Sequence, residues 1–77
     1  MPTLAIIDGI QILMYLNDHG EPHFYIRHGS IRAKIEIATG RQMKGDLSRS
    51  ALRKVQLWTE LNRDLLFKAW TDCQSRS

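Results

Sequence analysis

All three histidines of the chain fall within one segment, NDHGEPHFYIRHG at residues 17–29, together with Tyr25 and Arg27. Histidine exchanges a proton near neutral pH, arginine holds phosphate oxygens, and tyrosine can stack on a base. This chemistry suits a phosphodiester. RNA is the natural substrate class, because metal-free cleavage needs only a base for the 2′-hydroxyl and stabilisation of the developing charge.

Two predicted strands, HFYIRH at 23–28 and SIRAKIEI at 30–37, position these side chains. Successive side chains of a strand point to opposite faces of the sheet. We expect a turn at His28 and Gly29, which sets Tyr25 opposite Arg32 and His23 opposite the lysine of the second strand. One face of this hairpin is then apolar. The polar face consists of His23, Tyr25, Arg27, Arg32, Lys34 and Glu36.

This polar face predicts an RNA-acting protein. The candidate catalytic residues are His23, His19 and Tyr25, because imidazole and phenol groups can exchange protons. The candidate nucleic-acid ligands are Arg27, Arg32 and Lys34, whose cationic groups bind phosphate. The alternative is structural, since a solvent-facing strand face normally carries Lys, Arg and Tyr for solubility and edge protection.

Metal binding is the weaker interpretation of the same segment. His19 and His23 are four residues apart, the spacing that binds zinc on a helix, but the glycine and proline around them oppose a helix there. Asp18 or Glu21 could complete a shell for a metal-binding hydrolase. Otherwise Asn17 and Asp18 order the loop, and His19 hydrogen-bonds backbone carbonyls. We therefore predict neither a metal ion nor a cofactor.

The N-terminal half has the pattern of an antiparallel sheet. Residues 3–7 and 10–16 are apolar or β-branched, and they flank the dipeptide DG, which tolerates the positive φ angles of a tight hairpin turn. After the second hairpin, the dipeptide TG marks another turn, which leads to a short edge strand around Met43. We expect three to five strands over about residues 3–45.

After the sequence GDLS the period of the apolar residues changes from two to about 3.6, which indicates a helix. The aspartate and the two serines of DLSRS are candidate N-caps. Asn62 lies inside the apolar stripe and predicts either a kink or the start of a second helical segment. The expected fold class is α+β: a small antiparallel sheet against a C-terminal helical region at about 48–71, followed by a frayed tail at 72–77.

Composition indicates one small domain over residues 1–77. A chain of 77 residues with 43% hydrophobic residues has room for one core and would gain stability from a second copy, so a homo-oligomer is expected. Its single cysteine, Cys73, cannot form an internal disulfide, which fits the cytoplasm. No apolar run approaches the roughly 20 residues that cross a bilayer, so no membrane partner is expected. The net charge of +3 favours acidic partners such as RNA.

The segments NDHGEPHFY, AKIEIATG, GDLS and WTELNRDLLFKAW resemble the bacterial domain-of-unknown-function family numbered 4160 over nearly the whole chain. The family's pattern is Asn-Asp-His, a short turn with proline, and His-Phe-His. The matching positions are Asn17, Asp18, His19, Pro22, His23 and Phe24. Tyr25 replaces the last histidine and Glu21 replaces a frequent proline, so a metal-ligating pair of histidines on this strand would be incomplete.

The resemblance implies a small bacterial α+β protein that forms one half of a toxin–antitoxin-like pair, with a cognate small protein as its partner. Together with the polar face, it predicts the RNA-acting component of such a pair. The alternative function is a non-catalytic protein-interaction or regulatory module, in which the same face or the outer helix surface contacts a protein partner.

Overall fold

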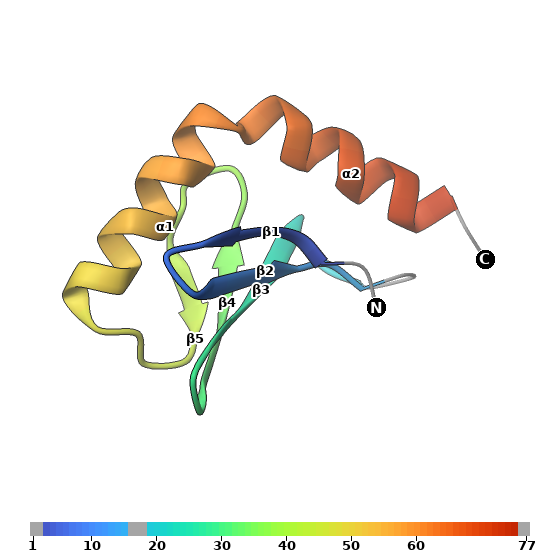
Figure 1. Cartoon of the computed structure of the whole chain (residues 1–77). Helices are drawn as coiled ribbons and strands as arrows, with labels where there is room; N and C mark the ends of the chain where they lie inside the picture. Colours follow the sequence, from blue (N-terminus) through green and yellow to red (C-terminus); the bar gives the residue numbers. More distant parts are fainter. Residues whose placement is uncertain (1–2, 16–18, 76–77) are drawn as a thin grey trace.

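The computed structural model describes residues 3–15 and 19–75 and places five strands ahead of two helices (Figure 1). The strands form one antiparallel sheet in the order β1-β2-β3-β4-β5, so the predicted α+β class is confirmed. Within these residues no helix is long and apolar enough to cross a membrane. The elements are β1 (Thr3–Ile7), β2 (Ile10–Leu13), β3 (His23–His28), β4 (Ile31–Glu36), β5 (Gln42–Lys44), α1 (Arg49–Leu61) and α2 (Arg63–Ser75).

The first hairpin turns at the predicted dipeptide. Asp8 and Gly9 both have positive φ, at 47° and 79°. This is the backbone conformation of the tight turn that matches the right-handed twist of paired strands, and Asp-Gly is among the dipeptides that adopt it most readily. The predicted short edge strand around Met43 is also present, as β5.

The second hairpin has the predicted faces but not the predicted register. His28 pairs with Ile31, so the turn residues are Gly29 and Ser30, one position later than expected. Gly29 has a φ of 62°, a left-handed conformation that glycine adopts at the least cost, and it therefore belongs inside the turn. The pairing moves by two residues, and a shift of two leaves every side chain on its predicted face.

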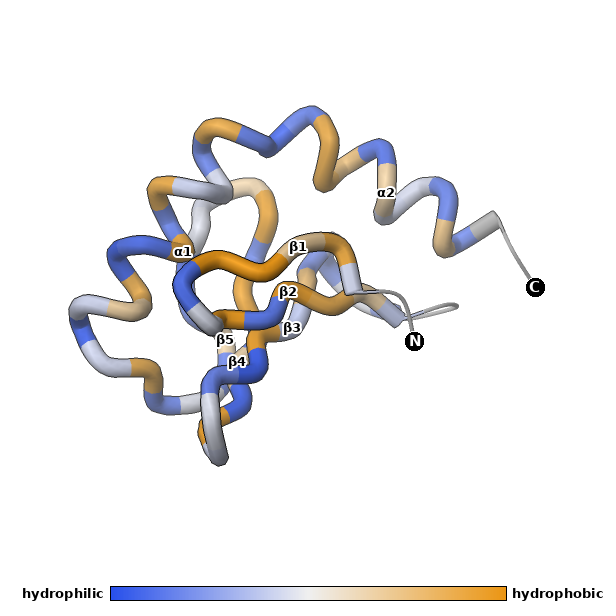
Figure 2. Tube along the Cα trace, in the orientation of Figure 1, coloured by the Kyte–Doolittle hydropathy of each residue, from blue (hydrophilic) through white to orange (hydrophobic). Residues whose placement is uncertain are grey.

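Both helices cover the apolar face of the sheet. Phe24 and Ile26 of β3 are fully buried, and the ring of Phe24 meets that of Trp58 from α1 edge to face at 6.2 Å between centroids. Leu66 and Cys73 of α2 complete the same core. Polar and apolar residues alternate along both helices (Figure 2), as expected for helices with one side against a sheet.

The helical region is broken where the sequence predicts a kink. α1 begins after Ser48, whose hydroxyl accepts a hydrogen bond from the Ala51 amide. It ends at Asn62, whose side-chain nitrogen donates to the Trp58 carbonyl at 2.9 Å, so this side chain closes α1 rather than capping α2. α2 continues to Ser75, beyond the expected end of the helical region at residue 71.

Side-chain donors of the helical region fasten it to the segment between β4 and β5. Gln56 donates to the Gly40 carbonyl at 3.0 Å, and Arg63 donates to the Ile37 carbonyl at 2.9 Å. Gly45, just after β5, lies so close to β4 that an added Cβ would overlap the Arg32 carbonyl oxygen. The β4–β5 connection is thus hydrogen-bonded to both helices, and the chain just after β5 packs closely against β4.

Candidate nucleic-acid interface

Cationic side chains of three adjacent strands lie on the sheet face opposite the core. The register sets Arg27 of β3 directly opposite Arg32 of β4, and Tyr25 opposite Lys34. Lys34 is in turn opposite Lys44 of β5. Four of the predicted site residues are therefore brought together, and Lys44 is added to them. We call the following set the basic face: Tyr15, Tyr25, Arg27, Arg32, Lys34 and Lys44.

Tyr25 lies at the centre of the basic face. Its ring meets that of Tyr15 edge to face, with 4.7 Å between centroids. A shallow hollow of about 200 Å³ beside Tyr25 is also lined by Arg32, Lys34 and Lys44. A smaller hollow of about 40 Å³ also has Tyr15 and Arg32 in its wall. A flat group placed beside Tyr25 would thus meet an aromatic ring and at least one guanidinium group.

On the basic face, like charges lie directly opposite each other on paired strands. Arg27 faces Arg32 and Lys34 faces Lys44, and like charges on directly opposed strand residues destabilise a sheet. Within the described residues, no acidic side chain lies within ion-pair distance of these four cations. The acid of the neighbouring β4 position, Glu36, accepts a hydrogen bond from the Thr39 hydroxyl. A bound anion would relieve the repulsion.

His23 shares the face of Tyr25 by alternation, but its side chain is buried, with 1% of the residue exposed. Its Nδ1 lies 2.6 Å from the Glu21 carbonyl oxygen, which can only accept, so Nδ1 carries the proton. The rings of Tyr25 and of Trp70 from α2 pack against the imidazole at 5.3 and 4.9 Å. Trp70 of α2 therefore covers the imidazole of His23. A catalytic role for His23 stays a prediction, and it requires access that this packing does not give.

The predicted site also includes residues of the loop before β3. His19 is exposed in that loop. Asn17 and Asp18 lie outside the described residues, so their predicted loop-ordering roles stay predictions. Among the residues that the structure describes, no group of three or more His, Cys, Asp or Glu side chains is placed to hold a metal ion.

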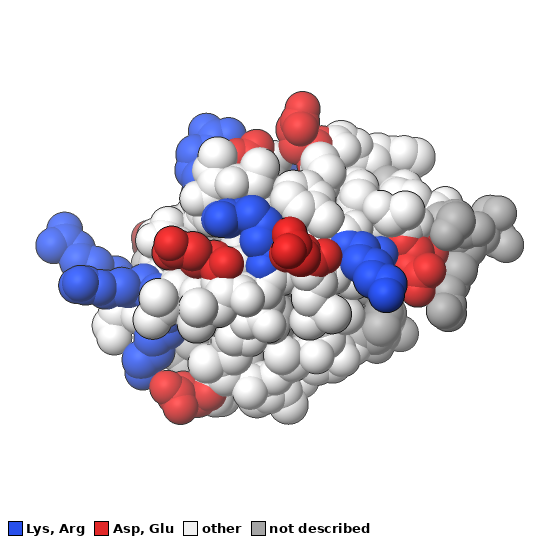
Figure 3. Space-filling model, turned by 90° about the horizontal axis from the view of Figure 1, so that it is seen from above, with Lys and Arg blue, Asp and Glu red and all other residues white. Residues whose placement is uncertain are grey.

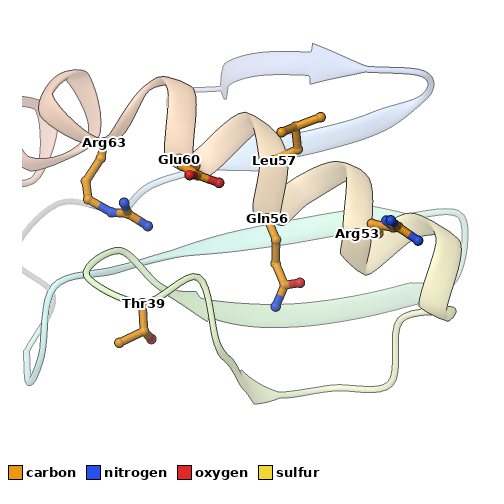
Figure 4. A pocket seen from close by; sticks show the side chains of 6 residues that line it. All are labelled: Thr39, Arg53, Gln56, Leu57, Glu60 and Arg63. Carbon is orange, nitrogen blue, oxygen red and sulfur yellow. The ribbon is translucent and has the colours of Figure 1, made fainter.

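A larger hollow, of about 490 Å³, lies between α1 and the β4–β5 connection (Figure 4). Its wall contains Arg53 and Arg63 but also Glu60, so its charges are mixed. Two of its side chains, Gln56 and Arg63, already donate to backbone carbonyls. Acidic and basic side chains also lie close together over the helical side of the molecule (Figure 3). The unbalanced positive charge of the basic face distinguishes it from this hollow.

Two members of the basic face were not among the residues predicted for the site. Tyr15 could have been found, because alternation along IQILMY places Gln11, Leu13 and Tyr15 on one face, and Leu13 pairs with Tyr25. Lys44 could not. The β4–β5 ladder shifts register between Lys34 and its neighbour, and no residue type in the sequence marks this bulge.

Comparison with known proteins gives a family and no function. No curated protein and no solved structure matches the sequence. A family model described as a domain of unknown function, DUF4160, matches residues 9–71, which include β2 to β5, α1 and most of α2. Because that match covers most of the chain, including the whole basic face, the protein belongs to the DUF4160 family.

Proposed function

We propose that the basic face binds single-stranded RNA. The proposal rests on two cross-strand pairs of like charge, Arg27 with Arg32 and Lys34 with Lys44, around the half-buried Tyr25. Such an arrangement costs stability in the free protein and is compensated by phosphate groups. Phosphate contacts supply most of the affinity of sequence-independent nucleic-acid binding.

A single strand fits this surface better than a duplex. Proteins that bind single strands combine a positive surface that follows the backbone with aromatic rings on which bases stack. Tyr25 supplies the ring, and the hollow of about 200 Å³ beside it gives space for a base. The bases of a duplex are stacked on each other and cannot use this ring. Within this proposal, Tyr25 contacts the base and the cations contact the backbone.

The test is a fluorescence anisotropy titration of a labelled single-stranded RNA over a range of salt concentrations. Four phosphate contacts predict a slope of log K against log salt of about −2.8, because each contact on a single strand contributes about −0.7. Arg27→Gln and Lys44→Gln should each reduce the slope by about 0.7. Lys68→Gln is the matched control, because Lys68 is an exposed cation on α2. Equal slopes for all four proteins would refute the proposal.

Tyr25→Leu tests the stacking contact separately from charge. Leucine keeps apolar bulk against Tyr15 but offers no ring to a base. Stacking of one base contributes about 1–3 kcal/mol by substitution, so RNA affinity should fall roughly 5- to 150-fold with the salt slope unchanged. A variant that binds RNA as tightly as the wild type would show that Tyr25 is not part of the interface.

Cleavage of the bound RNA, and toxicity in a toxin–antitoxin-like pair, are separate steps beyond binding. If His23 and His19 act on RNA, labelled RNA should be cut by the wild-type protein and left intact by His19→Ala and His23→Gln. Expression should then also inhibit growth. RNA that is bound and left uncut would restrict the function to binding.

A protein partner is the second candidate, because three leucines on the outside of the helices are exposed. Leu57, Leu61 and Leu65 have 59%, 76% and 58% of their surface exposed and follow one another at intervals of four residues. Exposed apolar patches on small proteins often mark protein contacts. We infer that a cognate partner would cover this leucine stripe, because the three side chains are largely exposed. Leu61→Asp should abolish co-purification with such a partner and leave RNA binding unchanged. A complex that survives Leu61→Asp would exclude the stripe.

A further inference from the structure

β1 forms one edge of the sheet and carries no charged side chain. Its residues, TLAII, pair with β2 on one side, and among the described residues the strand order ends at β1 on the other. Ile6 is 64% exposed and Leu4 is 36% exposed. Figure 2 shows β1 as a strongly apolar segment. Edge strands normally carry a charge, a proline or a cover, because their free N–H and C=O groups can pair with another strand.

We propose that the β1 strands of two copies of this chain pair antiparallel and form a dimer. The free N–H and C=O groups of an edge strand form hydrogen bonds with an extended segment. A segment that pairs with β1 must therefore be extended too. β1 of a second copy is extended and has no charge, so the contact brings no like charges together although each copy carries +3. The proposal is independent of RNA binding.

The sequence of β1 is self-complementary in one register. The β1–β2 register puts Ala5 and Ile7 on the core face and Ile6 on the opposite face. A two-fold axis at Ile6 pairs residues 5–7 with equal faces together, so that Ile6 of each copy lies opposite Ile6 of the other and covers it. Because the same patch is used by both copies, pairing closes at the dimer.

The contact between the two β1 strands is short, and its length determines the affinity that we expect for the dimer. Five strand residues span about 17 Å. The β1–β2 ladder is irregular between Thr3 and Ala5, so the regular part of the edge is shorter still. Contacts of this size belong to the small class of protein interfaces, so the dimer should be weak and depend on protein concentration.

Light scattering behind size-exclusion chromatography, without RNA, tests the dimer. From low to high micromolar protein, the mass should rise from 8.9 kDa towards twice that value. Ile6→Lys should weaken dimerisation roughly tenfold or more. Leu61→Lys, on the leucine stripe, is the matched control and should leave it unchanged. Both side chains are largely exposed, so both variants should fold, which a thermal melt checks. A wild type that is monomeric throughout, or a dimer lost in Leu61→Lys and retained in Ile6→Lys, would overturn the proposal.

Hydrogen exchange locates the contact without a substitution. Outward amides of β1 should exchange more slowly at high than at low protein concentration, because they become hydrogen-bonded in the dimer. Amides of α1 serve as the internal control, since they are hydrogen-bonded in either state. β1 amides that exchange at one rate across concentrations that double the mass would place the interface elsewhere and overturn the proposal.

Discussion

Replacing Arg32 by glutamine should make the protein more stable and a weaker RNA binder. Arg32 is opposite Arg27, and it lines both hollows beside Tyr25. Glutamine keeps most of the length of the side chain and removes its charge. Replacing a residue whose only role is to keep the sheet soluble would not raise the stability and weaken RNA binding at the same time. Opposite effects of this kind occur where a surface is kept strained for function.

The size of the stabilisation follows from the repulsion that is removed. Arg27 and Arg32 are both exposed, so water surrounds the two charges. Unit charges roughly 6–8 Å apart in water repel each other by about 0.5–0.7 kcal/mol. At physiological salt the Debye length of about 8 Å reduces this by roughly half. In a domain of this size, 1 kcal/mol shifts the melting temperature by about 4–8 °C. The expected rise is therefore about 2–5 °C at low salt and about 1–2 °C at physiological salt.

The assay compares thermal melts at low and physiological salt with RNA affinity measured by anisotropy. Lys68→Gln again serves as the control, because it lowers the net charge by the same amount. Lys68 has Asp64 and Asp72 four residues away on either side along α2, and each such helical pair contributes about 0.2–0.5 kcal/mol. The control should therefore melt slightly lower and bind RNA normally. Stability in Arg32→Gln that is unchanged or reduced at low salt would refute the argument from opposed charges.

Three further substitutions test parts of the fold that position the basic face. His23→Leu should cost about 0.5–1.5 kcal/mol in urea unfolding, because leucine cannot donate the hydrogen bond to the Glu21 carbonyl, and unchanged stability would contradict this role. Ser48→Ala should cost about 1 kcal/mol through loss of the N-cap, whereas Ser50→Ala, inside α1, should be nearly neutral in the same melts. Gly45→Ala should cost about 2–4 kcal/mol, since the new Cβ meets β4 and φ is 101°. Gly29→Ala, where nothing lies within 4 Å of a Cβ, should cost only about 1 kcal/mol. Equal losses at the two glycines would contradict the close approach.

Local sequence patterns predict much of this fold because each depends on neighbours in the chain. The dipeptide Asp8-Gly9 has the residue types that a tight turn needs, and the turn is found there. The change of period after GDLS predicts a helix, and Ser48 caps it. Asn62 predicts the break, although the sequence left open whether its side chain would close one helix or begin the next. That choice depends on whether the side chain reaches the Trp58 carbonyl, which is a matter of three-dimensional geometry.

The candidate site was predicted only in part, because exposure is set by residues far away in the sequence. Alternation correctly assigns His23 to the face of Tyr25. It says nothing of Trp70, which lies at the other end of the chain and covers the imidazole once α2 is in place. The same pattern of alternating polar residues therefore yields exposed cations at one end of the strand and a buried histidine at the other.

The position of one turn brings together the two arginines of the basic face. With the turn at His28 and Gly29, Tyr25 would lie opposite Arg32, and Arg27 would have no cation across from it. Moving the turn to Gly29 and Ser30 keeps both faces but brings the two arginines together. Glycine in the left-handed conformation at the first turn position accounts for this choice. The repulsion between Arg27 and Arg32, which an RNA phosphate would relieve, therefore follows from the register of the hairpin. Assigning each side chain to a face of the sheet does not predict it.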